Sequence, residues 1–143
     1  MTAAGAFDRW LLAPAPAARL GLLRLLVGVF AVGRLAARLA QFLGLADGSA
    51  ARFDPVGPLA WLPGPLPSGV VTGQVWVTLA LGVAFAAGLW FRALGPAFAV
   101  ALLGLTTYHS SFGQVLYFDN LLVLHVLVLA ASPAAAAWSL DAR

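Results

Sequence analysis

Three arginines, Arg24, Arg34 and Arg38, lie inside one long apolar segment that runs from Ala17 to Gly44. The chain of 143 residues is 62% hydrophobic and only 9% charged. A soluble domain averages about 25% charged residues, so this chain has too few polar side chains to cover a surface that faces water. We therefore expect an all-α integral membrane protein that encloses a few polar groups and has the lipid bilayer as its solvent.

The side-chain inventory excludes several kinds of chemistry. Cysteine, lysine and glutamate are absent, which excludes disulfides, thiolate metal sites, Schiff-base lysines and glutamate-based proton coupling. We identify no metal site and no cofactor. The eight arginines flank or enter apolar runs without forming a cluster, so nucleic acid is not an expected partner.

The chain reads as one membrane domain, 1–143, with four apolar segments of near-spanning length. Their approximate ranges are 17–44, 72–91, 96–112 and 117–134. Short connections, Arg92 to Gly95 and Gly113 with Gln114, make the later segments antiparallel neighbours. Pro96 is expected in the first turn of its helix, where a missing N–H is tolerated, and Pro133 at a kink or an end. These features predict a bundle of four transmembrane helices.

The connection 45–71 has a different composition. It holds five of the nine prolines, together with Trp61. Prolines at this density cannot continue a helix, and tryptophan is enriched at membrane interfaces. We predict an ordered outer loop at the interface with Trp61 as its anchor, and we favour a connecting role over that of a lid on a binding site.

The distribution of charge predicts the orientation in the membrane. With four spans, one side holds Arg9, Arg19, Arg92 and Arg143. The opposite side collects Asp47, Asp54 and Asp119, with Arg52. Because positive side chains are retained in the cytoplasm, we expect a multi-pass protein of the cell membrane with both termini cytoplasmic.

A polar seam is predicted along the first helix. At about 100° per residue, its three arginines and Gln41 fall within an arc of about 100°. Arg24 and Arg38 are near enough to the ends to extend toward the interface, a behaviour known as snorkelling. Arg34 lies near the middle of the segment, where an arginine costs about 2.5–3.5 kcal/mol, so it should face protein or water.

The partners of this seam are expected where the third and fourth segments meet. Antiparallel packing brings His109 to about the depth of Asn120, beside the outer half of the first helix. The candidate polar pocket therefore consists of Arg34, Arg38, His109, Asp119 and Asn120. In such a pocket the arginines would hold an anionic group and the histidine would transfer a proton. The alternative is that each group simply hydrogen-bonds at the membrane rim.

His125 is a secondary candidate inside the fourth segment. Its depth differs from that of His109 by about five residues, or ~7 Å, which is a poor match for the two axial ligands of a haem. We expect it to be neutral and hydrogen-bonded within the bundle, to Ser132 or to the arginine seam.

The carboxyl-terminal third carries the most identifying motif. Asn120 opens an apolar helix that is followed by Trp138, Ser139, Leu140 and Asp141, and Arg24 lies near the start of the first helix. These residues resemble the HTTM domain, the multi-pass domain of the vitamin K-dependent gamma-carboxylase superfamily. The resemblance implies a membrane protein that binds or processes a small or lipid-like molecule.

The resemblance covers only the amino-terminal part of that domain. The gamma-carboxylases have a histidine where this chain has Leu121, and their catalytic lysine lies beyond the Trp-Ser-Asp motif, so carboxylation is not implied. The chain is either a fragment or a minimal relative. It also resembles, as a second choice, the DoxX-like four-helix membrane proteins, which would make it a non-catalytic subunit of a redox or quinone system. A membrane partner protein or a second copy of the chain remains open.

Overall fold

Helices make up all the regular secondary structure in the part of the chain that the structure, a computed structural model, describes: residues 17–113 and 117–142. The α-helices are α2 (Ala17–Ala37), α3 (Leu39–Gly44), α4 (Ser68–Ala87), α5 (Phe91–Ser110) and α6 (Tyr117–Ala130). Three of them, α2, α4 and α5, are long and apolar enough to cross a membrane. The chain is therefore an all-helical protein whose three long helices have the length and hydropathy of membrane spans.

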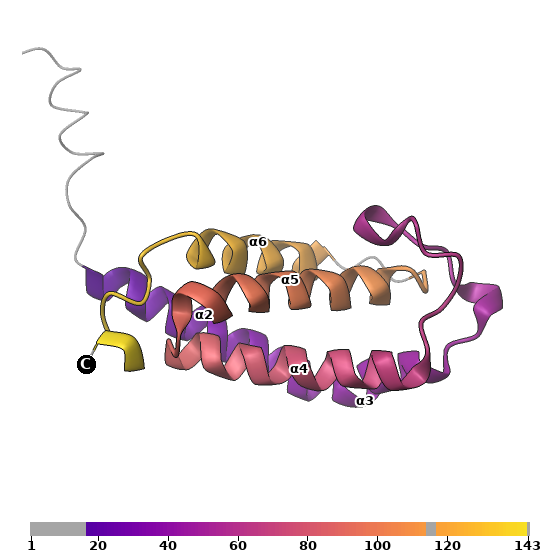
Figure 1. The fold of residues 1–143 in the computed structure, drawn as a ribbon, viewed down its shortest axis with the longest axis horizontal. Helices are drawn as coiled ribbons and strands as arrows, with labels where there is room; N and C mark the ends of the chain where they lie inside the picture. The colour runs from indigo at the N-terminus through magenta and orange to yellow at the C-terminus, as the bar shows by residue number, and fades with distance from the viewer. Residues whose placement is uncertain (1–16, 114–116, 143) are drawn as a thin grey trace, which may run out of the picture.

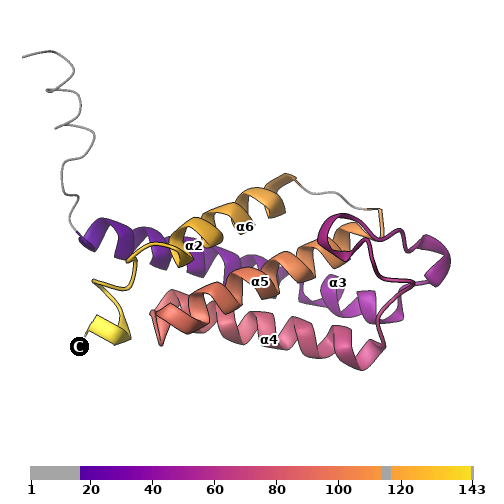
Figure 2. The same cartoon turned by 45° about the horizontal axis from the view of Figure 1, so that its top comes forward.

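The long helices run back and forth along one axis (Figures 1 and 2). The start of α2, the α4–α5 turn and the carboxyl-terminal segment meet at one end of the bundle, at the left of Figure 1. The loop between α3 and α4 covers the other end. The helix α6 packs against both α5 and α2.

The first predicted span is not one regular helix. Arg38 separates α2 from α3 with φ −110° and ψ 16°, although the backbone N–H groups of Arg38 and Phe42 still donate to the carbonyls four residues earlier. Arg34, expected near the middle of one continuous segment, lies in the last turn of α2.

The turn between the second and third helices lies earlier than predicted. It consists of Gly88–Trp90 rather than Arg92–Gly95, with φ +68° at Gly88 and +42° at Trp90. The helix α5 starts at Phe91, so Pro96 is inside it and not in its first turn. The early start follows from a tertiary contact, because the Asp141 carboxylate accepts the first backbone N–H groups of this helix.

The fourth predicted span, 117–134, contains a shorter helix. The helix α6 has 14 residues and is followed by turns that include Pro133. At ~1.5 Å per residue it measures about 21 Å, against a hydrocarbon thickness of about 30 Å. It is apolar but too short to cross a membrane alone. Gln114, part of the predicted turn before it, lies outside the described residues, as do Arg9 and Arg143.

The predicted loop 45–71 includes three short 3-10 turns, at Leu45–Asp47, Ala50–Arg52 and Gly57–Leu59, and ends where α4 begins at Ser68. The loop is attached to the end of α5. The Asp54 N–H donates to the Ser111 carbonyl (2.8 Å), and the Leu66 N–H donates to the Tyr108 hydroxyl (3.2 Å). Trp61 is 75% exposed.

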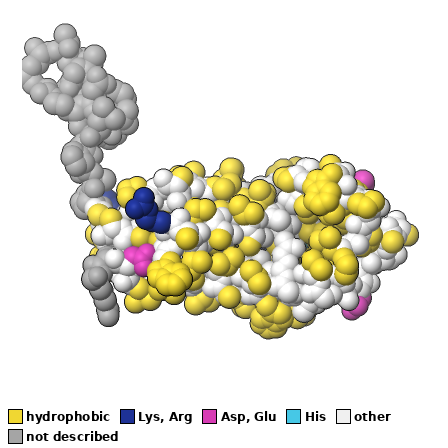
Figure 3. All heavy atoms as spheres, in the orientation of Figure 1, with side chains coloured by type: hydrophobic (Ala, Val, Ile, Leu, Met, Phe, Trp, Pro, Cys, Tyr) yellow, Lys and Arg dark blue, Asp and Glu magenta, His cyan; other side chains and the backbone are white. Residues whose placement is uncertain are grey.

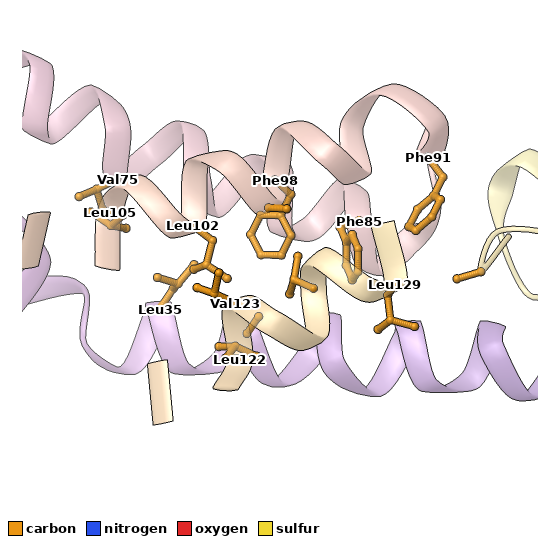
Figure 4. Close-up of a cluster of buried hydrophobic side chains, with 14 of the residues drawn as sticks. Leu35, Val75, Phe85, Phe91, Phe98, Leu102, Leu105, Leu122, Val123 and Leu129 are labelled. Carbon is orange, nitrogen blue, oxygen red and sulfur yellow. The ribbon is translucent and has the colours of Figure 1, made fainter. Parts of the chain in front are cut away.

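The core is a layer of aromatic and branched side chains between α2, α4, α5 and α6 (Figure 4). The ring of Phe85 lies 5.3 Å from that of Phe91 and 5.2 Å from that of Phe98. On the other side, Gly28 of α2 approaches Ala86 of α4 so closely that a Cβ at Gly28 would lie 2.8 Å from the Ala86 Cα. Small residues thus let α2 and α4 pack backbone to backbone. The outer face in Figure 3 is largely hydrophobic, with charges near its ends.

Candidate functional site: a buried polar chain between four helices

An ion pair joins the end of α2 to the start of α6. Arg34 Nε donates to Asp119 Oδ1 at 2.7 Å, and Arg38 Nη1 lies 3.5 Å from Asp119 Oδ2. The Asp119 side chain is only 7% exposed, whereas the arginines retain 25% and 21%. A cation in the last turn of a helix and an anion in the first turn both interact favourably with the helix dipoles. The local structure therefore favours charges of these signs at these positions.

Gln41 continues this contact into α5. Its Oε1 accepts from Arg38 Nε at 2.9 Å, and its Nε2 lies 2.9 Å from His109 Nε2. Because a guanidinium can only donate, the amide oxygen must face Arg38 and the NH₂ group must face the imidazole. His109 Nε2 is then an acceptor, and in the neutral ring the proton is on Nδ1.

His109 is buried at the inner end of this polar chain. It is 2% exposed, its ring centroid lies 5.4 Å from that of Phe42, and its Nδ1 has no hydrogen-bond partner among the described residues. Beside it is a cavity of about 270 Å³, here called the His109 cavity. The cavity is lined by Gln41, Gly44, Leu45, Gly48, Arg52, His109 and Phe112.

Four of the five predicted pocket residues are thus connected, and the fifth is not. Arg34, Arg38 and Asp119 touch directly, and His109 joins them through Gln41. Asn120 is exposed, because one residue along a helix turns the side chain by about 100° and Asp119 occupies the inward position. Gln41, which links the two halves, belonged to the predicted seam but not to the predicted pocket.

Arg24 forms a second polar cluster at the other end of the bundle. The expectation that it snorkels is wrong, since it is completely buried and donates from Nη2 to the Trp138 carbonyl. Its guanidinium carbon lies 5.8 Å from the centre of the Phe91 ring. Its Nε and Nη1 have no hydrogen-bond partner among the described residues.

The Trp-Ser-Leu-Asp stretch encloses this arginine. Asp141 accepts from the backbone N–H groups of Trp90 (2.9 Å) and Phe91 (2.7 Å), and Ser139 Oγ donates to the Ala135 carbonyl (2.6 Å). The motif therefore closes one end of the fold and caps α5. Spacing alone gave no sign that its carboxylate meets a turn 50 residues earlier.

His125 does not lie inside the bundle as predicted. It is exposed, and its Nδ1–H donates to the Leu121 carbonyl of its own helix at 2.7 Å. Ser132, one of its predicted partners, instead donates to the Leu129 carbonyl. Across the described residues, no three His, Cys, Asp or Glu side chains group as metal ligands would.

Comparison with known proteins adds no relative. No protein-family model matches the chain, and no curated protein or solved structure is significantly similar to it.

Proposed function

We propose that this chain is an HTTM-type, gamma-carboxylase-like membrane protein that binds or processes a small or lipid-like molecule with an anionic group at the His109 cavity. The observation that carries the proposal is the polar chain from Asp119 through Arg38 and Gln41 to a buried His109. Burying this many polar groups in a largely apolar protein is costly unless all of them are hydrogen-bonded. His109 Nδ1 lacks a partner among the described residues, which favours a bound ligand as its partner.

The charges beside the cavity favour an anion. Arg52 lines the cavity itself, and the polar chain that reaches the cavity through Gln41 and His109 carries the two positive charges of Arg34 and Arg38 against the single negative charge of Asp119. A planar guanidinium matches the geometry of a carboxylate or a phosphate. The imidazole would hydrogen-bond to the bound molecule or move a proton. The chain lacks the lysine of the gamma-carboxylases, so no carboxylation step is proposed.

In the proposed topology, this cavity lies on the outer side of the cell membrane. The helix α6 and the segment after it form a fourth crossing, and both termini are cytoplasmic. The arginine distribution supports this orientation, since Arg19 and Arg92, in the first turns of α2 and α5, lie at the end opposite to the α3–α4 loop with Asp47 and Asp54. The cavity would then open outward beneath the proline-rich loop.

The second candidate is a non-catalytic, DoxX-like membrane subunit or a partner of a redox or quinone system. The observation that favours it is the direct Arg34–Asp119 pair, which can hold α2 and α6 together without any ligand. In that case the whole polar chain would be structural. The two candidates differ in what happens when His109 is removed.

The test is ligand-induced stabilisation of the purified protein. Short-chain carboxylates and alkyl phosphates are screened for an increase in Tm; a ligand at 100 times its Kd adds about 2.7 kcal/mol of stability. We expect His109→Ala to fold and to lose this stabilisation. The matched control is His125→Ala, since His125 is exposed, lies outside the His109 cavity and hydrogen-bonds to the Leu121 carbonyl of its own helix.

Two outcomes would contradict the proposal. If His109→Ala lowers the Tm and no anion stabilises the wild type, the polar chain is structural and the subunit candidate is favoured. If both histidine variants respond to an anion as the wild type does, the anion binds away from the His109 cavity.

A further inference from the structure

A second cavity runs along the lipid-facing side of the bundle, between α2 and α6. We call it the α2–α6 groove. It has a volume of about 560 Å³ and is lined by Leu26, Val27, Phe30, Arg34, Phe118, Leu121, Leu122 and His125. Its size is within the range of about 300–1,000 Å³ that is typical of ligand sites. It shares no lining residue with the His109 cavity.

The rim of the groove is apolar and exposed, so in a bilayer the groove would open to the hydrocarbon. Its rim residues Leu26, Phe30 and Leu121 are 60%, 61% and 53% exposed, and they belong to helices whose outer faces are apolar. A further apolar cavity of about 290 Å³ continues from it past His125 toward Leu20 and Ser132. From Arg34 to Leu20 is 14 residues, or about 21 Å along α2 at ~1.5 Å per residue. This path has the length of an extended lipid chain.

The charge of the groove is confined to one end. Among the described residues that line the groove, Arg34 is the only charged one. Arg34 uses Nε for Asp119, and its Nη1 and Nη2 N–H groups have no hydrogen-bond partner among the described residues. The ion-pair cluster as a whole, with Arg38, retains one excess positive charge. Since Arg34 is in the last turn of α2 and pairs with the first turn of α6, this charge lies at one end of the groove, where the head group of a bound lipid would lie.

From this arrangement we infer that the α2–α6 groove binds one single-chain lipid with an anionic head, of the long-chain fatty acid type. The carboxylate contacts the terminal nitrogens of Arg34, and the hydrocarbon chain lies between Phe30, Leu121 and Leu122. One groove with one cationic end suits one chain and one head group. The inference goes beyond the proposed function, because it concerns a different cavity.

The test is equilibrium binding of a fluorescent fatty acid, dansyl-undecanoic acid, to the full-length protein in detergent at alkaline pH, with palmitate as competitor. We expect saturable binding of one probe per chain. Palmitate should displace the probe at least about tenfold better than palmitate methyl ester, because a charge-assisted bond to Arg34 is lost in the ester. Arg34→Gln should abolish this preference, and Arg34→Lys should retain it.

A matched pair of substitutions on α6 locates the site. Leu121→Trp fills the groove and should weaken binding about tenfold, whereas Leu127→Trp, on the same helix but outside the groove lining, should change it less than about twofold. Both side chains are exposed, so both variants should keep the wild-type Tm. His109→Ala should bind the fatty acid normally, which separates this inference from the proposed function.

Three results would overturn the inference. Non-saturable uptake of the probe would mean ordinary partitioning into the detergent or the protein surface. Equal competition by the acid and its ester would remove the role of Arg34. Equal binding by the two tryptophan variants would place the lipid elsewhere.

Discussion

Replacing Asp119 by asparagine tests whether the charged cluster holds α2 and α6 together. The amide would keep an oxygen at the position of Oδ1, which accepts from Arg34 Nε at 2.7 Å, but it would leave two arginines without their counter-charge. Removing one partner of a fully buried pair costs about 3–5 kcal/mol, and an exposed pair contributes about 0–1 kcal/mol. With side-chain exposures of 7% for Asp119 and 25% for Arg34, we expect a loss of about 2 kcal/mol.

The assay is reversible unfolding in mixed micelles of sodium dodecyl sulfate and dodecylmaltoside, supported by thermal scans. A loss of about 2 kcal/mol corresponds to a decrease of about 8 °C in Tm for a chain of this size. The double variant with Arg34→Gln should be more stable than the sum of the two single effects predicts, by about 1–2 kcal/mol. Arg38 keeps this coupling below the full value, since it also approaches Asp119.

The control is Asn120→Ala, which changes the exposed neighbour and should alter stability by less than about 0.5 kcal/mol. Strict additivity of the Asp119 and Arg34 variants would refute the reasoning, because side chains in direct contact must couple. An Asn120→Ala loss as large as that of Asp119→Asn would refute it too, since it would show that the helix register is different.

Three further predictions concern the other end of the bundle and the topology. Gly88→Ala should lower stability by at least about 1 kcal/mol, because φ is +68° and the new methyl group would collide with the Arg24 guanidinium. The control is Gly73→Ala, which adds a methyl group in open space and should be neutral or stabilising. Equal effects of the two substitutions would contradict the close approach of Arg24 to Gly88. Asp141→Ala should lower the free energy of unfolding by about 1–2 kcal/mol, because α5 loses its cap. The control, Asp47→Ala, should have almost no effect. Equal stability of the two variants would mean that the cap is absent. Trp61→Cys and Trp90→Cys each introduce a single cysteine where the native side chain is 75% and 73% exposed, respectively. A membrane-impermeant maleimide added to whole cells should label only the Trp61→Cys variant. Labelling of Trp90→Cys alone would show that the orientation is the reverse of the one proposed.

The arginines show which contacts helical periodicity can predict and which it cannot. It predicted that Arg34 and Arg38 face polar partners near His109 and Asp119, and Gln41 joins those four residues into one chain. Periodicity could not distinguish Asp119 from Asn120, because a rotation by one residue exchanges which side chain points inward. It also gave Arg24 the same face as Arg34, although the two arginines belong to clusters at opposite ends of the fold.

The ends of the helices were the hardest features to predict from the sequence. Hydropathy marks where apolar residues are, but a helix begins where its first N–H groups find acceptors. The helix α5 begins at Phe91 because Asp141, 50 residues later, accepts its N–H groups. In the same way, the proline-rich loop is ordered by contacts with the end of α5 that no local pattern contains.

What the sequence determined by itself is the solvent and the class of the fold. A chain that is 62% hydrophobic, with apolar runs long enough to cross a bilayer, can satisfy its backbone in lipid only as helices. The tertiary structure decided which charges meet. The single carboxylate that joins Arg34 and Arg38, the amide of Gln41 that reaches His109, and the carbonyl of Trp138 that receives Arg24 come from segments far apart in the chain or on different helices. Ion pairs and hydrogen bonds depend on ångström-scale distances across helix interfaces, and a pattern of residue types contains no such distances.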